Sequence, residues 1–162
     1  MIELVFVIVI LGVLAAVAVP RFVTTRTDAQ VAMLRSDIAS VLKAIPARVF
    51  AENLDPTTST PPGFSNWGEW MIDTGGLDRG RWVASTNNID PVIQSSSGTS
   101  SSNKCSNGII SINTTTGDLT FDPAKINNTS GQGTTLCTTL KNSYPSNSNR
   151  LIPLATTGAV KF

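Results

Sequence analysis

The stretch MIELVFVIVILGVLAAVAVP, residues 1–20, decides the fold, because it is almost wholly apolar yet carries one acid near its start. Nineteen residues of helix rise about 28 Å, close to the hydrocarbon thickness of a bilayer. The stretch lacks the basic front end of a signal peptide. We therefore expect a membrane-spanning helix over residues 1–19. Glu3 needs a separate explanation, since an intramembrane carboxylate costs roughly 2.5–3.5 kcal/mol on insertion scales.

Beyond Pro20 the helical pattern continues in amphipathic form. Apolar residues recur at spacings of three and four, which is the period of one helix face. They are Val31, Leu34, Ile38, Val41 or Leu42, Ile45 and Val49. Prolines inside a helical pattern bend it, so bends are expected at Pro20 and Pro46. Residues 1–52 are predicted to form one long, curved helix, with a transmembrane or filament-core part at 1–19 and an amphipathic stalk at 20–52.

Residues 53–162 are predicted to form a globular head of α+β class. The run SNWGEWMIDTGG suits a short helix capped by Ser65 and stopped by Gly75 or Gly76. Two β-rich runs, Ile109–Asn113 and Asp118–Phe121, flank a Thr/Gly turn and predict a hairpin. The final RLIPLATTGAVKF offers one or two further strands. The expected architecture is a small antiparallel sheet laid against the amphipathic part of the long helix.

Two other features of the head carry expectations. The tryptophans Trp67, Trp70 and Trp82 are expected to pack the head onto the long helix, with stacking on a sugar or an aromatic ligand as the alternative. The segment Ser95–Asn103, SSSGTSSSN, is of low complexity and is expected to be an exposed loop.

The composition argues against catalysis. The 162 residues have a net charge of +1 and include no histidine, the commonest general base and metal ligand. No nucleophile, phosphate-loop or zinc motif is present. We expect no enzyme activity, no cofactor and no metal. Cys105 and Cys137 are predicted to form a disulfide, which requires an oxidising compartment, with two buried thiols as the alternative.

The segment IELVFVIVILGVLAAVAVPRF resembles the N-terminus of type IV pilins and related pseudopilins. Glu3, Gly12 and Pro20 take the places of that family's Glu, Gly and Pro. The resemblance is specific over residues 1–22, weaker to about residue 52 and absent beyond. It implies a pilin-like fold and a structural role in a helical filament.

The resemblance also implies roles for individual residues. Glu3 would pair with the N-terminal amine of an adjacent subunit, with a carboxylate at headgroup level as the alternative. Because a misplaced subunit leaves unpaired charges in an apolar bundle, this pairing would fix the register of assembly. Gly12 and Pro20 would bracket a stretch that loses helix in the filament, with an ordinary kinked helix as the alternative. Phe6, Val7, Leu11 and Leu14 would pack in the filament core.

The family alignment further implies a removed basic leader and a methylated N-terminal residue. By that alignment the mature chain should begin two residues before Met1. Either the sequence starts inside the mature protein, which we favour, or Met1 is a true start. By the positive-inside rule, Arg21, Arg26 and Arg35 after the apolar run would place the head in the cytoplasm, whereas the cysteine pair favours the outside. A removed basic leader would resolve this conflict.

The expected function is therefore a type IV pilus-like subunit that polymerises through its N-terminal helix. Its predicted partners are other copies of itself, the inner membrane before assembly, prepilin peptidase and the assembly machinery. Its predicted location is a bacterial surface filament with an inner-membrane precursor pool. The alternatives are a pseudopilin of a type II secretion-like system and a minor tip pilin. Adhesion, motility, DNA uptake and secretion are not distinguished by the sequence.

The C-terminal part of the chain carries a candidate surface-binding patch. Four cations lie in the last forty residues, which contain no acid, and they are Lys125, Lys141, Arg150 and Lys161. On a filament they would attract DNA or anionic surfaces. Scattered, solvated charges are the alternative that we favour.

Overall fold

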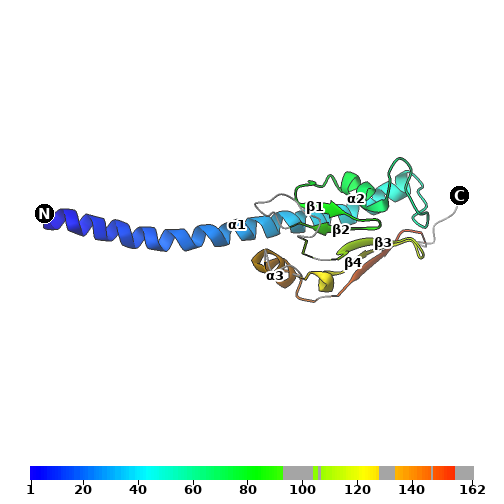
Figure 1. Ribbon diagram of the computed structural model, residues 1–162. Helices are drawn as coiled ribbons and strands as arrows, with labels where there is room; N and C mark the ends of the chain where they lie inside the picture. Colours follow the sequence, from blue (N-terminus) through cyan, green and yellow to red (C-terminus); the bar gives the residue numbers. More distant parts are fainter. Residues whose placement is uncertain (93–103, 106, 128–133, 147, 156–162) are drawn as a thin grey trace.

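A computed structural model describes residues 1–92, 104–105, 107–127, 134–146 and 148–155, with the backbone alone for residues 18–25 and 134. A long helix leads from the N-terminus into a head made of two short helices, a 3-10 turn and one sheet (Figure 1). In chain order the elements are α1 (Ile2–Ala51), α2 (Trp67–Gly75), β1 (Trp82–Ala84), β2 (Asn88–Pro91), β3 (Ile110–Asn113), β4 (Asp118–Phe121), η1 (Pro123–Lys125), α3 (Thr134–Asn142) and β5 (Arg150–Pro153). The predicted α+β class is confirmed.

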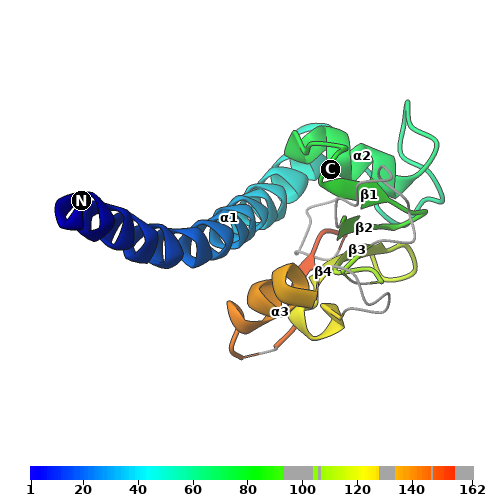
Figure 2. The same cartoon turned by 60° about the vertical axis from the view of Figure 1, so that its left-hand side comes forward.

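Helix α1 is continuous through Pro20 and Pro46, and it curves along its length (Figure 2). Its first half projects away from the head, and its second half lies along the head. Among the described residues, no helix is both long enough and apolar enough to cross a membrane. The expected span over residues 1–19 is thus not borne out.

The amphipathic half of α1 forms one wall of the head's core, as its spacing predicts. Val31, Leu34, Ile38, Val41, Leu42, Ile45 and Val49 are all buried in one cluster. The cluster also contains sheet residues such as Ile89, Ile110, Ile112 and Leu119. The three tryptophans are buried in the same core, which confirms that they pack rather than present an open stacking face.

The sheet is a five-stranded antiparallel meander in the order β1-β2-β3-β4-β5. The predicted hairpin is β3–β4, with Asn113 opposite Asp118 at its closed end. Gly117 has φ +77° in this turn, where a Cβ would lie 2.3 Å from that of Ala155, so both backbone and space require glycine. One C-terminal strand, β5, is present, and residues 156–162 lie outside the described ones.

The predicted short helix is α2, but its N-cap is Asn66 and not Ser65. The Asn66 side chain accepts a hydrogen bond from the Glu69 amide at 2.8 Å, because it lies three residues before the orphan N–H that a cap must satisfy. Gly76, with φ +61°, ends the helix as expected. The sequence did not predict β1, β2 or α3.

The predicted disulfide is present between Cys105 and Cys137. Cys105 precedes β3 and Cys137 lies in α3, which packs against α1. The bond therefore attaches α3 to the sheet side of the head. The predicted exposed loop Ser95–Asn103 lies outside the described residues.

Candidate assembly surface

The first third of α1 presents apolar side chains to solvent all round the helix. Every large apolar residue from Ile2 to Val17 is at least 44% exposed. Helices of this kind are covered by other protein or by lipid, since a helix that is apolar on every face has no side suited to water. Exposed apolar surface this extensive marks an interaction site.

The predicted assembly residues lie along this exposed stretch. Phe6 is 66% exposed, Val7 53%, Leu11 60% and Leu14 61%. These side chains therefore lie outside the core of the head, and packing them against another copy would not disturb that core. The space around Gly12 is open, since no described atom lies within 4 Å of where its Cβ would be. The backbone of Pro20 belongs to α1, and its side chain lies outside the described ones.

Glu3 is exposed in the first turn of α1. A carboxylate is favoured there by the partial positive charge at a helix N-terminus. Among the described residues no cation forms an ion pair with Glu3.

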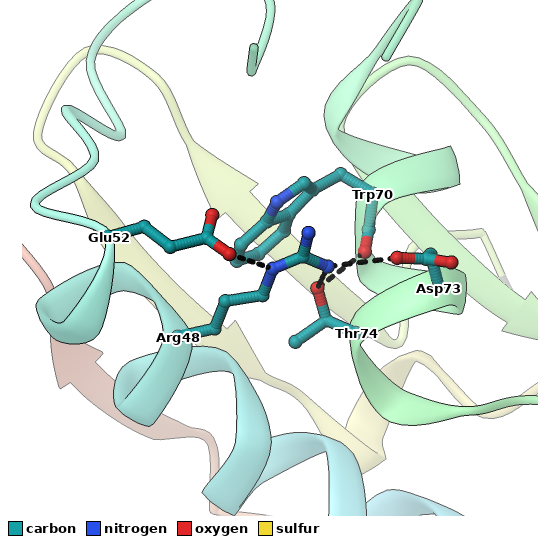
Figure 3. A network of polar contacts seen from close by, with 5 residues as sticks. All are labelled: Arg48, Glu52, Trp70, Asp73 and Thr74. Atoms are coloured by element: carbon teal, nitrogen blue, oxygen red, sulfur yellow. Dashed lines mark hydrogen bonds and ion pairs between the residues drawn. The ribbon is translucent and has the colours of Figure 1, made fainter. Parts of the chain in front are cut away.

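The second half of α1 is fastened to the head by Arg48. Its guanidinium contacts Glu52 Oε1, Asp73 Oδ2 and Thr74 Oγ1, each at 2.9 Å (Figure 3). The same group lies over the ring of Trp70, 5.3 Å from its centroid. Hydrogen bonds to Glu52 and Asp73 raise the pKa of Arg48 further above its ordinary value. The guanidinium therefore acts as a permanent charge that joins α1 to α2.

A second polar link joins α1 to the sheet. Trp82 Nε1 on β1 donates a hydrogen bond to Asp37 Oδ2 on α1 at 2.9 Å. Arg81 Nη2 reaches the same carboxylate oxygen at 3.4 Å. Together with Arg48, these contacts fix the rotation of the head about the helix.

The carboxylate of Asp90 is the buried acid of the head. It accepts hydrogen bonds from the amides of Gly108 and Ile109 at 2.6 and 2.9 Å, and Lys104 Nζ lies 3.3 Å away. These three donors offset the cost of burying the carboxylate. Its role is to hold the segment before β3 against β2.

The predicted cation patch is only partly described. Lys125 ends η1, Lys141 lies in the last turn of α3 and Arg150 begins β5, while Lys161 lies outside the described residues. Arg150 lines a groove beside α1, but Lys125 and Lys141 do not. The patch remains a prediction.

Sequence reasoning missed the contacts of Arg48, the burial of Asp90 and the groove beside α1. The spacing of Arg48 and Glu52 was the one available signal, since residues four apart meet on a helix. In the described part of the chain, no three acidic, histidine or cysteine side chains gather as a metal site would require. No family model, curated protein or solved structure matches the chain.

Proposed function

We propose that this protein is the structural subunit of a type IV pilus-like helical filament. The observation that carries the proposal is the exposed apolar stretch of α1 from Ile2 to Val17, which projects away from a folded head (Figure 1). The motif resemblance over residues 1–22 supports the same role. The subunit would polymerise by bundling this stretch with its counterparts in other copies.

Packing must supply the selectivity of assembly. If the precursor is held at the inner membrane, lipid is as apolar as the helix bundle, so transfer between them carries little hydrophobic gain. Close contacts of Phe6, Val7, Leu11 and Leu14 would then stabilise the bundle. Pairing of Glu3 with the N-terminal amine of a neighbouring copy would set the axial register, because a misplaced copy leaves two charges unpaired.

Two phenylalanines on α1 provide a matched test of the packing. Phe6 and Phe50 are 66% and 52% exposed, on the apolar and on the head-bearing half respectively. We expect Phe6→Ala to reduce the filaments sheared from cells that express the chain with its assembly machinery, and Phe50→Ala to leave them near wild type. Equal yields from the two variants would contradict the proposal.

The charge is tested on the same cells. Glu3→Gln keeps the shape of the side chain and removes its charge, and Asp28→Asn makes the same change at another exposed position of α1. We expect filament loss with the first variant alone. A wild-type filament yield from Glu3→Gln would refute the proposed register pairing. The packing proposal would then still be tested by the two phenylalanine variants.

The location of the protein separates the alternatives. An abundant surface filament supports the major-subunit role, and a chain retained in the cell envelope supports a pseudopilin of a secretion system. A chain that is present only in trace amounts in the filament would be a minor tip subunit. Mass spectrometry of sheared filaments and of envelope fractions distinguishes these three results.

A further inference from the structure

A groove with a volume of about 480 Å³ runs beside the head-bearing half of α1. One wall is the helix itself, where Ala32, Ser36 and Ala39 present short side chains and leave room. The opposite wall comes from the end of β4, the segment after α3 and the start of β5. The volume lies within the roughly 300–1,000 Å³ typical of small-molecule sites.

An aromatic pair forms the centre of the groove. Phe121 on β4 and Tyr144 after α3 meet edge to face, with ring centroids 5.1 Å apart. The buried side chains of Ile38 and Leu42 add an apolar floor from α1. The groove therefore has a surface that suits an apolar or flat group.

Two arginines flank this aromatic centre. The Arg35 guanidinium lies 5.5 Å from the centroid of the Tyr144 ring. Arg150 lies directly opposite Phe121 in the β4–β5 ladder, so both side chains are on one face of the sheet. Burial raises the pKa of Tyr144, and the positive charges of Arg35 and Arg150 oppose that rise. The charges of Arg35 and Arg150 thus both act on the groove at Tyr144.

The charge of this groove is not balanced within the described part of the chain. No lining residue is Asp or Glu. In the described segments no carboxylate forms an ion pair with Arg35 or Arg150, whereas Arg48, Arg79 and Arg81 each pair with at least one. Two guanidinium groups that have no carboxylate partner among the described residues, beside an apolar floor, are suited to an anion with an apolar part.

We propose that this groove binds a small oxyanion, a carboxylate or a phosphate group, carried on an apolar body. Guanidinium groups match the geometry of both oxyanions and form strong, charge-assisted hydrogen bonds with them. The exposed Ser146 and Ser148, which also line the groove, would add hydroxyl donors. The apolar body would lie against Phe121 and the floor. The proposal does not depend on filament assembly.

The chain contains one tyrosine, Tyr144, and it lies in the groove. Selective labelling of the tyrosine ε carbons gives the ring signal of one residue in NMR spectra of the full chain, kept dispersed in a non-ionic detergent. The probes are benzoate, acetate, inorganic phosphate and the neutral analogue benzyl alcohol, at constant ionic strength set with chloride. We expect the signal to move saturably with the three oxyanions and not with benzyl alcohol.

The comparison between probes tests each half of the proposal. Tighter binding of benzoate than of acetate supports the apolar body, and equal affinities would overturn that half. Both acetate and phosphate are expected to bind. The one that binds more tightly shows whether the groove prefers a carboxylate or a phosphate group. A saturable response to benzyl alcohol equal to that of benzoate would overturn the anion site.

Substitutions locate the site. Arg35→Gln and Arg150→Gln should each weaken benzoate binding by about tenfold or more, the usual effect of losing one charge-assisted hydrogen bond. Arg79→Gln is the matched control, because Arg79 is exposed and pairs with Glu69 away from the groove. Arg150 begins an exposed strand, so its variant tests the site even if Arg35→Gln disturbs α1. Unchanged affinity in the Arg150 variant, or an equal loss in the Arg79 variant, would refute the proposal.

Discussion

Removal of the Cys105–Cys137 disulfide gives a stability change that can be worked from the structure. The two cysteines are separated by 32 residues. The chain-entropy model gives about 3.7 kcal/mol at 25 °C for a loop of this length. Both cysteines are buried, so alanine is the suitable replacement, because serine would bury a hydroxyl group. We expect Cys105→Ala/Cys137→Ala to lower the free energy of unfolding by about this amount.

The assay is urea unfolding of the full chain in non-ionic detergent, followed by tryptophan fluorescence. All three tryptophans are buried in the head, so their emission reports its unfolding. The slope of free energy against urea should also rise, because the unfolded chain without the cross-link exposes more surface.

The reduced wild-type chain is the matched control, since it keeps both sulfur atoms and loses only the cross-link. It should be destabilised to the same extent as the double variant. A loss in the alanine variant that the reduced chain does not share would assign the effect to packing of the sulfur atoms. A loss below about 1 kcal/mol in both would refute the loop-closure reasoning.

Three further predictions concern α1 and the groove. Ile45→Ala should lower the free energy of unfolding by about 2–5 kcal/mol, because Ile45 is fully buried. Phe50→Ala, on the exposed face, should lower it far less, and urea unfolding measures both. Arg48→Met should lower the free energy of unfolding by about 1–2 kcal/mol, because it removes the contact with the Trp70 ring and two ion pairs. Arg79→Met, which removes one exposed ion pair, should lower it by under about 0.5 kcal/mol in the same assay. Burial raises the pKa of Tyr144 above its ordinary value of about 10, so the folded state holds that proton more tightly. The resulting stabilisation is complete below pH of about 10 and is lost as the pH rises through the folded-state pKa, and Tyr144→Phe should remove that part of the pH dependence.

Local patterns predicted the elements whose signals lie close together in the sequence. The stripe from Val31 to Val49 needs only the helical period, and the β3–β4 hairpin needs only its turn. The strand β2 was missed because it reads Asn-Ile-Asp-Pro, in which a buried acid and a proline contradict a strand pattern. Asp90 is tolerated there because of donors that lie eighteen and nineteen residues further along the chain.

The assembly surface and the groove also differ in how far the sequence alone predicts them. The exposed apolar stretch could be predicted, since a run of apolar residues is visible in the sequence. The groove could not, because Arg35 and Arg150 come together only through the packing of α1 and the pairing of β4 with β5. The short helix α3 was missed because its Thr-rich sequence has few apolar residues, and its burial depends on Cys137 and Leu140.

Helix α1 belongs both to the exposed apolar stretch and to the core of the head, and this has a consequence for synthesis. The helix is translated before the head, and β3 and β4, whose residues share one core cluster with its stripe, follow some sixty residues after its end at Ala51. Cys137, which secures α3, follows later still. Throughout that interval the stripe lacks the side chains of β3, β4 and α3 that complete the core, so the nascent chain is most prone to aggregation before its head is complete. Whatever holds the apolar stretch from Ile2 to Val17 during translation therefore acts while the stripe from Val31 to Val49 also lacks its full cover.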